Sequence, residues 1–231
     1  MKKHSERTHA ILSASSSERW LNCPPSARLE EQEPEQTSVY AEEGTKAHEL
    51  AELLITADVK RVSSEMLEAT TYYKNYVMGI YQEALRLDEN ARLLLEQKLN
   101  LSNYIPNGFG TVDALIVSKY KWHVIDFKYG KGVNVEAEQN TQLMIYALGA
   151  ISKFKNPPTT ILLHIVQPRI WNASKWKCWS IPTEELIKWG KELVKPTARL
   201  SFNGQGEFRV GHWCRWCKVR SKCKKKQEET L

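Results

Sequence analysis

Two aspartates and a lysine interrupt apolar runs near the middle of the chain. Asp113 lies in "GTVDALIV", while Asp126 and Lys128 lie in "WHVIDFKYG". Side chains two positions apart point to the same face of a strand, so Asp126 and Lys128 should share a face, and an antiparallel turn can bring Asp113 alongside. Two carboxylates in a half-buried site repel each other unless a cation lies between them. We therefore expect a divalent-metal site of the oxygen-rich kind that suits Mg²⁺ or Mn²⁺.

Such a site is suited to phosphoryl chemistry. A divalent cation can hold a phosphate and lower the pKa of a bound water, and Lys128 can orient that water and stabilise the charge of the transition state. An Asp-x-Lys pattern is short, however, and the alternative is a surface ion pair on an amphipathic strand, with Asp113 capping a turn.

Two further residues extend the candidate site. Glu96, in "LLLEQKL", lies on a strand expected to pack next to the first two, where it is either another acidic ligand or an ordinary strand residue. His48, in "EGTKAHELAE", lies on an expected helix and can present its imidazole to the same metal. A solvated or buried structural histidine is the alternative for His48.

The carboxyl-terminal segment contains a second potential metal site. Its cysteines are Cys214, Cys217 and Cys223. Close thiolates repel unless a metal neutralises them, and three ligands leave a tetrahedral or cubane site one short. Cys23 is the natural fourth ligand, although His212 can take its place. Cysteine spacing does not identify the metal, so zinc and iron–sulfur remain open. Cys178, between two tryptophans, fits a buried strand residue better than a ligand.

The elements around these residues predict a mixed α+β fold. Helical periodicity predicts helices at 39–55 and 64–86, and capping signals predict helices at 18–23, 137–152 and 183–194. Strand-like runs at 91–101, 108–117 and 122–130 predict a meander, followed by strands at 159–169 and 175–181. We divide the chain into an amino-terminal segment (1–38), a core (39–200) and a carboxyl-terminal cysteine segment with a basic tail (201–231).

Composition narrows the class of protein. The 231 residues are 42% hydrophobic, enough for one main domain, and a formal charge of +6 favours a polyanionic partner such as nucleic acid. No apolar run approaches the length of a membrane span, and the first twenty residues lack the apolar core of a signal peptide. We expect a cytoplasmic protein with no membrane association. In that reducing compartment, cysteines serve as free thiols or metal ligands more often than as disulfides.

The order of the motifs resembles a known nuclease family. "GTKAHE", "GTVDAL", "DFKYGKG" and "QLMIYA" follow the order found in the RecB-like branch of the PD-(D/E)XK nucleases, which includes CRISPR-associated RecB-like exonucleases and several phage proteins. The resemblance implies a restriction-endonuclease-like core, with His48, Asp113 and Asp126 as metal ligands and Lys128 as the catalytic lysine. It also implies that Gln142 and Tyr146, four apart on one helical face, help to position DNA.

The resemblance extends to the cysteines. Several RecB-like nucleases hold a [4Fe–4S] cluster with one cysteine before the core and three after it, which matches the layout here. The implied function is a Mg²⁺- or Mn²⁺-dependent exonuclease acting on DNA ends in recombination, repair or processing, in a bacterial host cytoplasm if phage-encoded. Related exonucleases form rings, so the likeness allows a homo-oligomer. The alternatives are a DNA-end-binding recombination or packaging accessory with little catalysis, and a zinc-containing nucleic-acid-binding protein.

Overall fold

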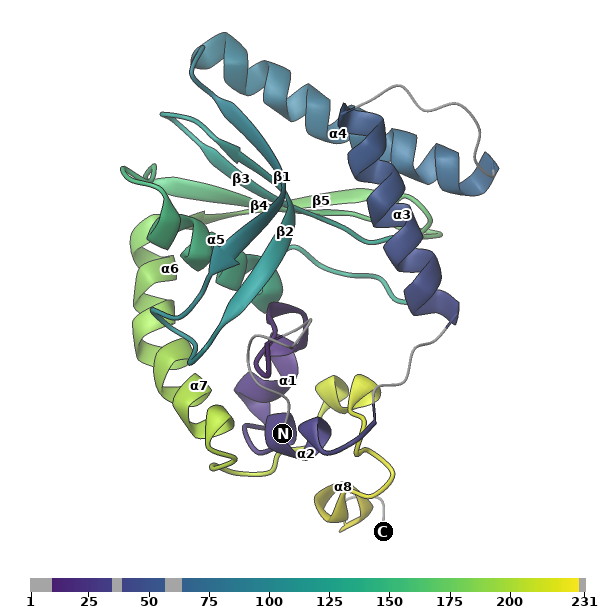
Figure 1. Cartoon of the computed structure of the whole chain (residues 1–231), viewed down its shortest axis with the longest axis vertical. Coiled ribbons are helices and arrows are strands. Elements are labelled where there is room, and N and C mark those ends of the chain that lie inside the picture. The colour runs from purple at the N-terminus through teal and green to yellow at the C-terminus, as the bar shows by residue number, and fades with distance from the viewer. Residues whose placement is uncertain (1–9, 35–38, 57–63, 229–231) are drawn as a thin grey trace.

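One five-stranded sheet forms the centre of the molecule (Figure 1). The computed structural model describes residues 10–34, 39–56 and 64–228. The strands, in both chain and spatial order, are β1 (Arg92–Asn100), β2 (Phe109–Val117), β3 (Trp122–Phe127), β4 (Thr160–Val166) and β5 (Trp176–Pro182). Neighbours are antiparallel except β3 and β4, which are parallel. The expected mixed α+β class and the meander of the first three strands are confirmed.

The parallel pair requires a crossover, and α5 (Thr141–Lys153) supplies it. Asn140 caps this helix by accepting a hydrogen bond from the Leu143 backbone N–H at 3.2 Å. Eight consecutive residues of α5 are buried, because the helix is packed between the sheet and other helices. The elements near it are η2 (Ala14–Ser16), α1 (Ser17–Asn22) and α6 (Thr183–Trp189).

The opposite face of the sheet is covered by α3 (Val39–Thr56) and α4 (Ser64–Leu87), which pack on each other (Figure 1). Tyr73 and Val77 of α4 join Phe127 of β3 in a second buried cluster. The sheet therefore lies between two helical layers, and the candidate residues on β2 and β3 are reached by helices from both sides.

Element boundaries differ from the expected ones at three places. The helix expected from residue 137 begins at Thr141, where Asn140 provides the cap. β3 ends at Phe127, so Lys128 follows the strand rather than lying within it. The last expected helix ends at Val194, but the structure continues it. The helix passes through η3 (Gly190–Val194) into α7 (Lys195–Phe202), whose first turn tolerates a proline.

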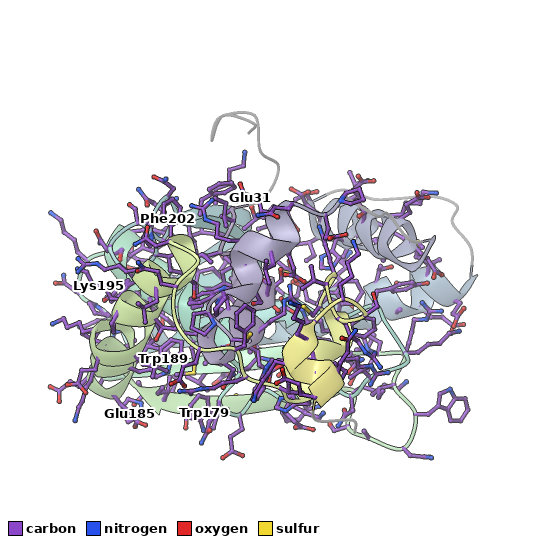
Figure 2. The ribbon with its side chains drawn as sticks, turned by 90° about the horizontal axis from the view of Figure 1, so that it is seen from below. Glu31, Trp179, Glu185, Trp189, Lys195 and Phe202 are labelled. Atoms are coloured by element: carbon purple, nitrogen blue, oxygen red, sulfur yellow. The ribbon has the colours of Figure 1, made fainter. Side chains whose placement is uncertain are left out.

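The two ends of the described chain lie side by side (Figure 1). α2 (Ser26–Glu31), which was not expected, follows the two prolines and packs on α7. The guanidinium of Arg28 lies 4.5 Å from the Phe202 ring centroid and pairs with Glu31, and both contacted residues are labelled in Figure 2. The carboxyl-terminal elements are η4 (His212–Trp216) and α8 (Lys224–Glu228). Among the described residues, no helix is both long and apolar enough to cross a membrane.

Candidate active site

The sheet opens between β2 and β3 at the two aspartates. Their pairing ends at Ala114 and Ile125, and the next residues along the two strands are Asp113 and Asp126. Asp113 Oδ2 accepts the backbone N–H of Phe127 at 2.7 Å, which takes the place of a strand-to-strand bond. This opening, called the fork below, places Asp113 and Asp126 on neighbouring strands, side by side as the sequence predicted, and Asp126 is buried.

Three donor residues meet on the Asp113 side of the fork. Glu96 of β1 stands opposite Asp113 in a register that is regular on both sides, and its φ of +43° places it in the left-handed region. That conformation costs about 1–3 kcal/mol in a residue other than glycine, and such strain is found most often at functional sites. His48 Nδ1 from α3 lies 3.4 Å from Asp113 Oδ1. One ligand atom from each of the three residues lies within 4.8 Å of the others.

The electrostatics of this donor group indicate crowded negative charge. Burial and the charge of Asp113 raise the pKa of Glu96 to about 7, against the opposing charge of His48. Burial lowers the pKa of His48, but the hydrogen bond and charge of Asp113, with Asp126 and Glu96, outweigh it and raise that pKa to about 9. Oxygen and imidazole donors around a negative centre suit a divalent cation.

The second part of the candidate site is the ion pair of Lys128 and Asp126, which flank Phe127 in the chain. The Lys128 Nζ lies 2.8 Å from Asp126 Oδ2 and donates to Gln142 Oε1 at 2.9 Å. Gln142 Nε2 in turn donates to Asp126 Oδ1 at 2.8 Å. Burial lowers the pKa of Lys128, but the adjacent Asp126 carboxylate raises it above its ordinary value. The lysine is therefore a held cation at neutral pH.

Gln142 and Tyr146 lie on one face of α5, as their spacing predicted, and their side chains are hydrogen-bonded to each other. Tyr146 is buried against the sheet, where burial raises the pKa of its hydroxyl. Both polar ends of the Gln142 amide are used within the protein, on Lys128 and Asp126. The pair therefore orients the lysine and the aspartate, and a contact with DNA stays a prediction.

The donor group differs from the ligand set implied by the family resemblance. His48 and Asp113 come together as expected, but Glu96 completes the group in which all donor atoms lie within 4.8 Å, in place of Asp126. Asp126 Oδ2 is buried and receives no well-angled hydrogen bond, although the Lys128 ammonium is adjacent. The cation next to this oxygen is the Lys128 ammonium, and the role of Asp126 as a metal ligand stays a prediction.

A groove of about 1700 Å³ begins at Lys128 and Gln142. Serines of η2 and α1 and residues 133–136 form its sides, and the carboxyl-terminal segment around Trp216 forms its far wall. Trp216 is 68% exposed, and the Arg215 guanidinium lies 5.2 Å from its ring centroid. The lining carries both acidic and basic side chains. Lys128 and Gln142 thus face the same groove as the carboxyl-terminal segment, whereas His48, Glu96 and Asp113 do not line it.

A family model whose description is "Protein of unknown function (DUF2800)" matches residues 9–231. The chain belongs to the DUF2800 family. Among solved structures, the crystal structure of SSO0001 is similar at 16% sequence identity and a TM-score of 0.39, over 96% of this chain and 91% of that one.

The DUF2800 match includes both cysteine-bearing ends, and the structure brings these ends together. One small cavity of about 20 Å³ is lined by all four expected cysteines: Cys23, Cys214, Cys217 and Cys223. Burial, with the charges of Cys214 and Cys223, raises the pKa of the Cys23 thiol, although the Arg209 backbone N–H donates to its sulfur. A thiol of raised pKa stays protonated at neutral pH unless a metal ion stabilises its thiolate, and a metal centre at this cavity stays a prediction.

Several polar contacts in this DUF2800 chain fasten the two ends, and none was predicted from the sequence. Arg19 pairs with Glu30 at 2.6 Å and donates to the Trp216 carbonyl, and Glu30 also accepts the Lys218 backbone N–H. His212 Nε2 lies 2.6 Å from the carboxylate of Glu18, a residue of α1. This contact uses only Nε2 of His212, so the alternative in which His212 replaces Cys23 as a ligand stays open.

One expectation about a neighbouring residue was wrong in part. Cys178 lies on β5 as expected but is exposed, because β5 is an edge strand. Its Sγ lies 3.8 Å from His164 Nε2 on the α4 side of the sheet, far in topology from the other cysteines. Trp213 lines both the cysteine cavity and the groove, whereas Trp216 lines the groove.

Proposed function

We propose that this DUF2800 member is a metal-dependent deoxyribonuclease that hydrolyses phosphodiester bonds at DNA ends. The observation that carries the proposal is the arrangement at the fork of the sheet. The donor group of His48, Glu96 and Asp113 adjoins the buried pair of Lys128 and Asp126, and Lys128 also lines a large groove. A cation beside a held ammonium is the combination that phosphodiester hydrolysis requires.

The donor group fits Mg²⁺ or Mn²⁺. Glu96 and Asp113 supply carboxylate oxygens, which these ions prefer, and His48 supplies a nitrogen that Mn²⁺ also accepts. The charges of Asp113, Asp126 and Glu96 raise the pKa of His48 to about 9, so the group attracts positive charge, which a divalent cation would supply. When bound, a divalent cation lowers the pKa of a water and offsets phosphate charge.

The chain's own residues then have separate tasks. Lys128, kept protonated by Asp126, is placed to donate to a phosphate oxygen and stabilise the charge that builds on it. Gln142 holds both members of that pair in fixed orientations through its amide. Asp113 is held by the Phe127 backbone, so its second oxygen stays directed at His48. Each side chain is fixed by a neighbour before substrate binds.

We infer a [4Fe–4S] cluster rather than a single zinc ion for the four cysteines, and the layout of one cysteine before the core and three after it supports this. Four thiolates around one zinc at about 2.3 Å would bring their sulfurs to roughly 3.8 Å from one another. In the described part of the chain, no three of these four sulfurs lie within 4.8 Å of one another. The metal content of the purified protein decides between the two centres.

Cleavage of end-labelled linear DNA tests the function. Anaerobically purified wild type is compared with Lys128→Ala on single- and double-stranded substrates, with Mg²⁺ or Mn²⁺. We expect progressive shortening by the wild type and at least a 100-fold slower rate for Lys128→Ala, because a positioned electrostatic group contributes about that much. Lys153→Ala, at the exposed end of α5, is the matched control and should cleave normally.

The alternative function has a distinct outcome. A DNA-end-binding accessory would retard labelled DNA in a gel yet leave it intact with both metals, in wild type and Lys128→Ala alike. That result would contradict the nuclease proposal. Cleavage by both proteins at equal rates would instead remove Lys128 from the mechanism.

A further inference from the structure

The loop between the catalytic candidates is held in an unusual way. Residues 128–140 form neither helix nor strand, yet they connect Lys128 at the end of β3 to Gln142 in the first turn of α5. The relative placement of these two side chains, which contact each other, depends on the course of this loop. Its glycines, Gly130 and Gly132, have open space around them and do not fix the backbone by packing.

Gln167, directly after β4, fixes the loop from inside. The side chain is buried, with 3% of the residue exposed. Its Nε2 donates to the carbonyls of Gly130 and Val133, both at 2.8 Å, and its Oε1 accepts the Val135 backbone N–H at 3.1 Å. Both amide hydrogens and the amide oxygen therefore bond to the backbone of one segment, residues 130–135. Its backbone N–H continues the pairing with the β5 side by donating to the Lys175 carbonyl at 2.7 Å, so the whole side chain remains available to the loop.

Arg169, two positions later, connects the same loop to the opposite helical layer. Its side chain is 8% exposed, and its guanidinium lies 4.0 Å from the Tyr129 ring centroid. The guanidinium pairs with Glu43 of α3 at 3.7 Å and Glu65 of α4 at 3.1 Å, and the Tyr129 hydroxyl is hydrogen-bonded to Glu43. α3 is the helix that carries His48. Arg169 therefore links the position of His48 to that of the loop beginning at Lys128.

We propose that Gln167 and Arg169 of the "QPR" segment are positioning residues for the site, with different targets. Gln167 sets the loop that aligns Lys128 with Gln142, and Arg169 sets α3 and thereby the distance of His48 from Asp113. The proposal rests on the proposed nuclease function for its catalytic half and on metal binding alone for its Arg169 half. Side chains that orient ligands from behind typically change metal affinity or activity by about 10–100-fold when removed.

The two roles predict a split between metal affinity and turnover. Arg169→Met should weaken Mn²⁺ binding about tenfold or more in a calorimetric titration, and Arg169→Lys should recover part of the loss. Gln167→Met should leave Mn²⁺ affinity unchanged, lower kcat about tenfold or more, and speed hydrogen exchange across residues 128–140. Arg86→Met, on the exposed end of α4, is the matched control for a lost arginine and should change neither quantity.

A purely structural role would lower the folded fraction of both variants without this split. If Arg169→Met does not fold, Glu43→Gln removes the same link from a 40% exposed side chain and decides the matter. Wild-type Mn²⁺ affinity in the folded arginine or glutamate variant overturns the Arg169 assignment. Unchanged hydrogen exchange in residues 128–140 of Gln167→Met overturns the Gln167 assignment. Both readouts hold even if the wild type proves not to cleave DNA, in which case the proposed function alone fails.

Discussion

Glu96 and His48 make the stability of the metal-free protein depend on pH. The pKa of Glu96 rises from 4.5 to about 7 in the folded state, so its ionisation is disfavoured by folding. The contribution of Glu96 to stability is therefore fully present below pH 4.5 and is lost as the pH rises toward 7. The pKa of His48 rises from 6.5 to about 9, so its contribution is present below pH 6.5 and is lost as the pH rises toward 9.

The Glu96→Gln variant separates these two effects. With a chelator present, we expect the melting temperature of the wild type to fall relative to that of Glu96→Gln as the pH rises from 4.5 to 7. Burial lowers the pKa values of His123 to about 4 and of His164 to about 3, and their neutral forms stabilise both proteins alike in this window. Both proteins should lose stability between pH 6.5 and 9, where His48 titrates. Thermal denaturation followed by circular dichroism measures this directly. Mn²⁺ should raise the melting temperature of the wild type most at high pH, where the ligands are ionised.

A wild type and a Glu96→Gln variant with parallel pH profiles would contradict this account of the donor group.

The role of Glu96 itself was only half predictable. An acidic residue in an apolar strand marks a candidate, but its nearness to Asp113 depends on strand register and on one left-handed backbone position. Asp126 and Lys128 were predictable as neighbours because strand alternation alone determines that they share a side.

α5 illustrates what a helix must satisfy to place Gln142 over the sheet. Gly149 stands on its buried face, where a Cβ would lie 2.7 Å from Leu101 and 3.1 Å from Leu99. Gly79, on α4, has nothing within 4 Å of its Cβ position. The same glycine-to-alanine change should therefore have opposite effects. In α4 it should stabilise the fold by about 0.5–1 kcal/mol through helix propensity.

Gly149→Ala should destabilise the protein by about 1–3 kcal/mol, because the extra methyl overpacks a core in which both leucines are buried. Urea denaturation of Gly149→Ala and Gly79→Ala beside the wild type measures the two free energies of unfolding. Stabilisation of Gly149→Ala would mean that α5 has room to move away from β1. The contact between Lys128 and Gln142 would then be less rigid than the structure shows.

Most helices and strands were predictable because their apolar periodicity is regular. The five strands, the order of pairing in the first three, and α3 and α4 follow from patterns of period two and 3.6. α2 was missed because prolines precede it and its six residues are too few for a periodic signal. The fork between β2 and β3 was also beyond prediction. Its cause is a side-chain contact, from Asp113 to the Phe127 backbone, that no local pattern encodes.

The arrangement of the whole molecule brings together two ends that are almost 200 positions apart in the chain. The sequence indicated this only through the cysteines, since the salt bridges that accompany them join single charged residues without any spacing rule. The groove runs from the candidate site to this junction, so the junction determines the shape of the groove's far wall. If the cysteines hold a metal centre and the groove binds DNA, as proposed, loss of that centre should weaken both stability and DNA binding.

Cys23→Ser tests this connection against Cys178→Ser, which alters an exposed cysteine on the far edge of the sheet. We expect anaerobically purified wild type and Cys178→Ser to contain iron and acid-labile sulfide in equal amounts, and Cys23→Ser to contain much less of both. By analogy with a long-range crosslink, Cys23→Ser should lose about 2–5 kcal/mol of stability. Under the proposed function it should also bind DNA more weakly, because the contacts of Arg19, Glu30 and Glu18 alone then hold the carboxyl-terminal segment. Zinc in place of iron in the wild type would assign the cavity to a mononuclear site. A Cys23→Ser protein with full metal content would mean that the three carboxyl-terminal cysteines hold their metal without the amino-terminal end.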